Sequence, residues 1–183
     1  MSTSREITIP YAFQPRGYQL PALQALDSGK YKRFYLTWHR RAGKDKLSWN
    51  FIIKRAVRVV GQHFYLFPTY AQGEKALWQG IDNTGFSFLS HVPPQLVDGK
   101  PNESAMQVKL KNGSIIQIIG TNNYDSVRGS NPMTCVFSEY PYQDPGAWAA
   151  ISPILRLNGG LAIFNGTPNG ENHAKDLWDM AQN

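Results

Sequence analysis

Short apolar runs alternate with segments of helical spacing along this chain. Four runs of four or five residues are rich in β-forming side chains, which is typical of buried strands. They cover residues 34–38, 63–67, 133–137 and 161–164. Between the first two, residues 45–60 place apolar side chains on one face of a helix, and Gly61 ends it. Strands that alternate with helices predict an α/β domain with a mostly parallel central sheet flanked by helices.

Shorter elements complete the pattern. Further helices are expected over residues 72–80, 147–155 and 174–180. Residues 107–110 and 114–120 flank Asn112-Gly113, a strong turn signal, and predict a β-hairpin. No repeat, low-complexity tract or linker divides the sequence, so we expect residues 1–183 to form a single domain.

The composition narrows the class of protein. Hydrophobic residues make up 42% of the chain and charged residues 17%, as in an ordinary globular protein. The single cysteine excludes an intramolecular disulfide, so a reducing, cytoplasmic compartment is expected. Residues 1–10 lack the apolar core of a signal peptide, and no apolar run is long enough to span a bilayer. The net charge of +6 favours a polyanionic partner, although the clustered basic residues also fit a solvated surface.

The loop after the first predicted strand carries a candidate phosphate-binding sequence. Gly43-Lys44 matches the end of the pattern Gly-x-x-x-x-Gly-Lys-Ser/Thr, whose backbone N–H groups surround phosphates while the lysine reaches the β and γ groups. The N-terminus of the next helix adds further donors. Trp38 replaces the first glycine, and Asp45 replaces the hydroxyl residue that binds magnesium. A basic surface turn followed by a helix-start carboxylate is the alternative interpretation.

The loops after the predicted strands 133–137 and 161–164 carry polar residues at the same edge of the sheet. Residues 133–137 run into Ser138-Glu139, as in a Walker B segment, where an aspartate holds magnesium and a glutamate deprotonates the attacking water. Ser138 occupies the aspartate position and Glu139 that of the base. Residues 165–168 could sense the γ-phosphate. A strand end with one exposed glutamate, and a tight turn, are the alternatives.

Together these loops resemble the Walker A, Walker B and coupling motifs of terminase large-subunit ATPases from tailed bacteriophages. The matching segments are 38–45, 136–139 and 166–168. Two further segments also resemble this family. Residues 15–19 are similar to its adenine-recognising segment, with a helix entry that has Pro15 at its start as the alternative interpretation. Arg128-Gly129 is similar to its arginine-glycine pair upstream of Walker B. The resemblance extends from about residue 15 to residue 183.

The resemblance implies a P-loop NTPase of the ASCE type that uses ATP and Mg²⁺. The residues implied to bind the nucleotide are Arg16, Tyr18, Gln19, Arg40, Arg41, Ala42, Gly43, Lys44 and Asp45. Glu139 would position water, Arg40 would stabilise the γ-phosphate in cis, and Thr167 would couple hydrolysis to motion. Arg128 would act in trans on a neighbouring subunit, with a local ion pair to Asp125 as the alternative.

Two departures from the family pattern concern the metal. Asp45 stands where a hydroxyl is expected, and Ser138 stands where a carboxylate is expected. The two groups have traded places, which leaves the local charge unchanged. Because Mg²⁺ takes oxygen ligands and keeps several waters, a carboxylate could serve from either side. We therefore hypothesise that Asp45 binds magnesium and that Ser138 has the minor role, against the alternative that phosphates and water alone hold the ion.

The function implied by the resemblance is ATP-driven packaging of double-stranded DNA into a procapsid, in the host cell cytoplasm. The implied partners are DNA, the portal protein, the small terminase subunit and further copies of the chain in a ring. No part of the sequence matches the C-terminal nuclease domain of a full large subunit. A helicase-type ATPase and a nucleotide-binding scaffold without turnover are the alternative functions.

Overall fold

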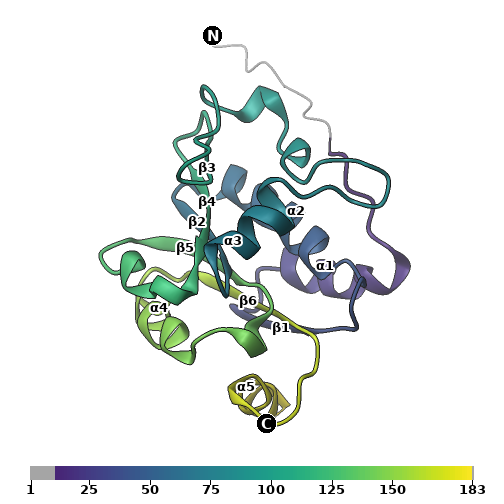
Figure 1. Cartoon of the computed structure of the whole chain (residues 1–183), viewed down its shortest axis with the longest axis vertical. Coiled ribbons are helices and arrows are strands. Elements are labelled where there is room, and N and C mark those ends of the chain that lie inside the picture. Colours follow the sequence, from purple (N-terminus) through teal and green to yellow (C-terminus); the bar gives the residue numbers. More distant parts are fainter. Residues whose placement is uncertain (1–10, 183) are drawn as a thin grey trace.

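A six-stranded sheet forms the centre of the molecule in a computed structural model, which describes residues 11–182 (Figure 1). The strands are β1 (Arg33–Thr37), β2 (Gln62–Phe67), β3 (Gln107–Lys109), β4 (Ile115–Gly120), β5 (Pro132–Phe137) and β6 (Leu161–Gly166). Their order in the sheet is β1-β6-β5-β2-β4-β3. All neighbours are parallel except β3 and β4. The predicted α/β class with a mostly parallel sheet is confirmed.

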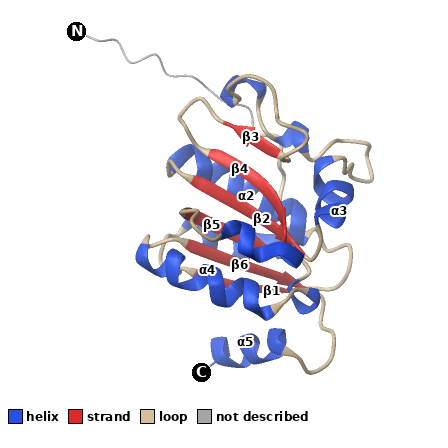
Figure 2. Cartoon of the chain, turned by 60° about the vertical axis from the view of Figure 1, so that its left-hand side comes forward, coloured by secondary structure: helices blue, strands red, loops and turns tan. Residues whose placement is uncertain are grey.

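Helices cover both faces of this sheet (Figure 2). They are α1 (Leu20–Asp27), α2 (Lys44–Arg58), α3 (Tyr70–Gly73), α4 (Pro145–Leu157) and α5 (His173–Gln182). The expected helix over 72–80 is present as far as Trp78, but it is α-helical only to the end of α3 at Gly73 and continues as a π-helical turn over Glu74–Trp78. None of the described helices is long and apolar enough to cross a membrane.

Alternate residues of each strand pack into two separate cores, because successive side chains of a strand point to opposite faces. On one face, Tyr65 of β2 packs with Leu47 and Ile52 of α2. On the other face, Leu66 packs with Ile151 of α4. The continuous apolar runs that predicted the strands therefore reflect burial on both sides, as expected for parallel strands.

The predicted hairpin joins β3 and β4 and also closes the C-terminal end of α2. Gly113 takes the left-handed conformation (φ 92°) that the turn requires. The Asn112 Nδ2 group donates to the carbonyl oxygen of Ala56 at 2.9 Å, and the Ser114 hydroxyl donates to the same oxygen at 2.7 Å. The turn thus satisfies a helix-end carbonyl that has no partner within the helix.

Strand register brings three loops to one edge of the sheet. Thr37 of β1 lies opposite Gly166 of β6, and Phe137 of β5 lies opposite Phe164 of β6. The chain therefore leaves β1, β6 and β5 at neighbouring points. Ligands bind at this carboxyl edge in open α/β sheets.

Candidate active site

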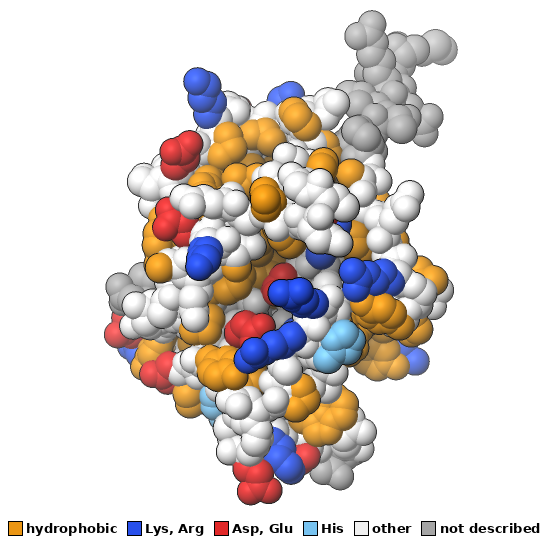
Figure 3. Space-filling model, turned by 45° about the vertical axis from the view of Figure 1, so that its right-hand side comes forward, with side chains coloured by type: hydrophobic (Ala, Val, Ile, Leu, Met, Phe, Trp, Pro, Cys, Tyr) orange, Lys and Arg blue, Asp and Glu red, His pale blue; other side chains and the backbone are white. Residues whose placement is uncertain are grey.

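A cleft of about 1020 Å³ opens at the carboxyl edge of the sheet. Eight of the residues expected to form the site line it: Arg16, Gln19, Arg40, Arg41, Gly43, Lys44, Asp45 and Glu139. Figure 3 shows basic and acidic side chains gathered around a hollow on one face of the molecule. Residues from three distant parts of the sequence therefore share one cleft.

The phosphate-loop sequence lies between β1 and α2, as predicted. Gly43 is in the left-handed conformation (φ 78°) immediately before the first turn of α2. The Lys44 side chain is buried, and its Nζ donates to the carbonyls of Trp38 (3.0 Å) and His39 (3.2 Å) and to Thr167 Oγ1 (3.2 Å). None of the ion pairs between described residues involves Lys44. Its charge is therefore not neutralised by a carboxylate contact and is available to an anion.

The segment expected to recognise adenine braces the phosphate loop. Tyr18 Oη donates to the Ala42 carbonyl at 2.8 Å, and Gln19 Nε2 donates to the same oxygen at 2.9 Å. Arg16 Nη1 donates to Tyr18 Oη at 2.8 Å. The left-handed conformation of Gly43 favours glycine, and a Cβ atom added there would lie 2.9 Å from Gln19 Nε2, so this side chain would have to shift. Arg16 and Gln19 also face the cleft, whereas the Tyr18 ring packs edge-on against Trp38.

The two residues predicted to exchange magnesium-binding roles are in direct contact. Ser138 Oγ donates to Asp45 Oδ1 at 2.6 Å. Tyr65 Oη donates to the same oxygen at 2.8 Å, and Asn165 Nδ2 lies 3.5 Å from the Tyr65 hydroxyl. Asn165 also accepts a hydrogen bond from Ser48 on α2. Sequence reasoning missed Tyr65, which reads only as an aromatic residue in an apolar strand.

The donor set fits a magnesium ion that keeps most of its waters. Among the described residues there is no group of three or more His, Cys, Asp or Glu side chains that could form a closed metal site. Mg²⁺ bound beside phosphates usually takes only one or two carboxylates from the protein. Asp45 supplies such a carboxylate in the cleft, and both hydrogen bonds that it accepts from side chains reach Oδ1.

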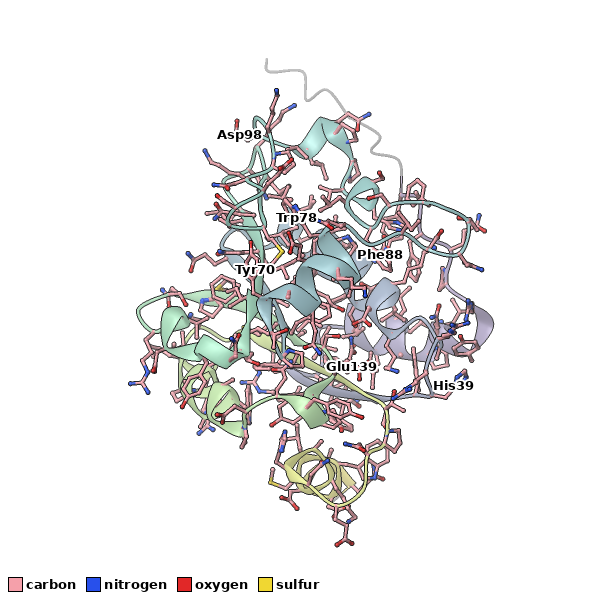
Figure 4. All side chains as sticks on the ribbon, viewed as in Figure 1. His39, Tyr70, Trp78, Phe88, Asp98 and Glu139 are labelled. Atoms are coloured by element: carbon pink, nitrogen blue, oxygen red, sulfur yellow. The ribbon has the colours of Figure 1, made fainter. Side chains whose placement is uncertain are left out.

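Glu139, labelled in Figure 4, follows Ser138 in the turn after β5 and has an unusual backbone conformation. Its φ of 53° is uncommon for a residue other than glycine, and such conformations cluster at functional sites. Gln143 Nε2 holds this turn by donating to the carbonyls of Ser138 (2.7 Å) and Leu66 (3.0 Å). Sequence reasoning also missed Gln143, which no motif marks.

The electrostatic surroundings of Glu139 favour a proton acceptor. Partial burial raises the pKa of its carboxyl group, and the negative charge of Asp45 raises this pKa further. The charges of Lys44 and Arg40 oppose that increase. Burial plus a like charge in a cleft is the usual way in which a carboxylate becomes a general base.

Arg128 does not line the cleft of its own chain. Its Nε lies 2.7 Å from Asp125 Oδ1, and both side chains are about two-thirds exposed (68% and 70%). The local ion pair considered as an alternative is thus present. The action of Arg128 on a neighbouring subunit stays a prediction.

The mostly parallel sheet, with a glycine-lysine turn between β1 and α2, has the P-loop fold of the ASCE type. No protein-family model and no curated protein matches the chain. Among solved structures it is similar to the large terminase ATPase domain of Thermus phage P74-26, with a TM-score of 0.73 and 18% identity over 91% of this chain and 70% of that one. It is also similar to the large terminase of the thermophilic bacteriophage D6E, with a TM-score of 0.67 and 13% identity over 91% of this chain and 42% of that one. The fold implied by the resemblance is confirmed.

Proposed function

We propose that the chain binds ATP and Mg²⁺ in this cleft and hydrolyses ATP to drive double-stranded DNA into a phage procapsid. The observation that carries the proposal is the convergence of Lys44, Asp45 and Glu139 in one cleft of a terminase-type fold. On this proposal the chain acts in the host cytoplasm, in a ring on the portal protein with the small terminase subunit as a further partner.

The cleft supplies what phosphoryl transfer to water needs. The backbone N–H groups at Gly43-Lys44 and the N-terminus of α2 receive the phosphates. Lys44 exchanges its bonds to loop carbonyls for bonds to the β and γ oxygens. Magnesium, when bound, neutralises charge on these oxygens. Arg40 stabilises the γ-phosphate in cis.

Glu139 accepts a proton from the attacking water, whose oxygen bonds to the γ-phosphorus as the bond to the β–γ bridging oxygen breaks. The products are ADP and inorganic phosphate. Thr167 is hydrogen-bonded to Lys44 in the structure. When phosphate draws Lys44 away, Thr167 loses this partner, and the loop after β6 is free to transmit the change.

The contact between Asp45 and Ser138 supports the hypothesis that the carboxylate and the hydroxyl at the magnesium site have exchanged positions. It argues against the alternative of a nucleotide-binding scaffold without turnover. We expect Asp45→Ser to weaken Mg²⁺ binding, because the cleft loses its only Walker A carboxylate. Ser138→Asp alone places two carboxylates where Asp45 Oδ1 and Ser138 Oγ are now 2.6 Å apart. The double change restores one hydroxyl and one carboxylate and should recover turnover above either single variant. Turnover measured against Mg²⁺ concentration checks this, and a double variant no better than Asp45→Ser would refute the exchange.

Phosphate release with and without DNA tests the proposed function. A packaging motor hydrolyses ATP, and double-stranded DNA or the portal raises the rate. Lys44→Ala, which removes the point charge at the phosphates, is the matched inactive control. Binding of ATP with no turnover under any of these conditions would favour the scaffold alternative. ATP-dependent strand separation would favour a helicase, although the described residues 11–182 form a single sheet without a second lobe.

A further inference from the structure

Tyr65 is a core residue whose hydroxyl reaches the edge of the candidate metal site. The side chain lies on β2 and is fully buried. Its ring stacks on Phe67 with centroids 5.4 Å apart and contacts the Trp49 ring edge-on at 5.9 Å. Full burial and these two ring contacts fix the ring, so the position of the hydroxyl oxygen is set by the core rather than by the cleft.

The hydroxyl contacts only one oxygen of the Asp45 carboxylate. Oδ1 accepts from Tyr65 Oη at 2.8 Å and from Ser138 Oγ at 2.6 Å. Among the described residues no side-chain hydrogen bond reaches Oδ2. Asp45 itself lines the cleft. The carboxylate is therefore held through one oxygen, and the other remains able to take a ligand.

The direction of the Tyr65 proton is also set. Asn165 Nδ2 approaches the same hydroxyl oxygen from β6 at 3.5 Å as a donor, which leaves the phenol proton for Asp45. An ionised carboxylate oxygen only accepts, so the phenol is the donor in the 2.8 Å contact between Tyr65 Oη and Asp45 Oδ1.

We infer that Tyr65 is a positioning residue for magnesium: it fixes the Asp45 carboxylate so that Oδ2 faces the ion beside the nucleotide phosphates. The inference rests on the proposed function, since it assumes that MgATP occupies the cleft. Donors that hold a metal-binding carboxylate in place are typically worth about 10- to 100-fold in metal affinity. The alternative is that Asp45 merely satisfies a buried phenol and has no role toward a metal.

Tyr65→Phe separates these two roles, because it removes one oxygen and keeps the ring that packs in the core. The affinity of a fluorescent ATP analogue is measured over a series of Mg²⁺ concentrations and in EDTA, and Mn²⁺ binding is followed by electron paramagnetic resonance. We expect a metal affinity about 10- to 100-fold weaker, with unchanged nucleotide affinity in EDTA. Tyr70→Phe is the matched control, since it loses a phenolic hydrogen bond of 2.9 Å to the Ser104 carbonyl, outside the cleft.

Each outcome decides between the inference and its alternative. Parental metal affinity in folded Tyr65→Phe would overturn the inference and leave the proposed function standing. So would a loss of nucleotide affinity that is equal with Mg²⁺ and in EDTA. If Tyr65→Phe does not fold, Asp45→Asn keeps an oxygen that can accept from Tyr65 but removes the carboxylate charge, and parental metal affinity in that variant overturns the inference instead. A parent chain that binds no nucleotide in either condition overturns the proposed function, and this inference with it.

Discussion

Glu139→Gln should leave ATP bound and reduce its hydrolysis by about 10²- to 10⁴-fold, the usual effect of losing a positioned base. The amide has the size of the carboxylate but cannot accept the proton of the attacking water. The turn itself should survive, because it is held by backbone and Gln143 contacts: Tyr142 N donates to the Glu139 carbonyl at 2.9 Å. Equilibrium binding of labelled ATP, measured next to phosphate release, separates the two effects.

A matched control for this change is Glu103→Gln, which makes the same substitution at an exposed position outside the cleft. It should keep parental turnover. If Glu139→Gln hydrolyses ATP at the parental rate, Glu139 is not the base. If it fails to bind ATP, the loss of activity says nothing about proton transfer, and Glu139 serves binding instead.

Arg128→Ala should abolish turnover in assembled rings without changing ATP binding to a single chain. An arginine supplied in trans is worth about 10³- to 10⁵-fold in rate. Arg128 lies outside its own cleft, and its pair with Asp125 is exposed on both sides. Exposed ion pairs contribute only about 0–1 kcal/mol, so the side chain can leave Asp125 at little cost when a neighbouring subunit offers a phosphate.

Mixing Arg128→Ala with Glu139→Gln subunits tests the trans role. Neither variant is active alone, but mixed rings contain some interfaces with an intact Arg128 and an intact Glu139. Arg58→Ala is the control, because it removes another exposed arginine that lies near an aspartate, Asp27. Assembled mixtures without any recovered turnover would contradict the trans role, as would an Arg128→Ala ring that is active by itself.

The sequence predicted the strands well because each parallel strand is apolar on both faces. Local patterns do not encode which strands pair, so the insertion of β6 between β1 and β5 was not predictable from them. Helix α1 was not predicted. It has only eight residues, and Pro21 near its start indicates where a helix can begin but not how far it extends. The segment after α3 stays helical, as expected, but the change from α-helix to a π-helical turn after Gly73 was not predictable from the sequence pattern; Gly73 packs closely against Ile118.

Candidate site residues could be predicted where polar residues follow shortly after a strand end. Lys44, Asp45 and Glu139 were predicted in this way, and the structure brings them into one cleft. Tyr65 and Gln143 were not, because their roles depend on which neighbours the sheet gives them. The Tyr65 hydroxyl meets Asp45 only because β2 lies beside β5 and beneath α2.

A crystal structure of the chain with Mg²⁺ and a non-hydrolysable ATP analogue tests the central claim most directly. We expect the triphosphate at the N-terminus of α2, with Lys44 Nζ moved from the Trp38 and His39 carbonyls to the β and γ oxygens. The metal should lie at Asp45, and the adenine ring of the analogue should lie near Arg16 and Gln19. An analogue bound outside this cleft, or one whose phosphates do not contact Gly43-Lys44, would contradict the account.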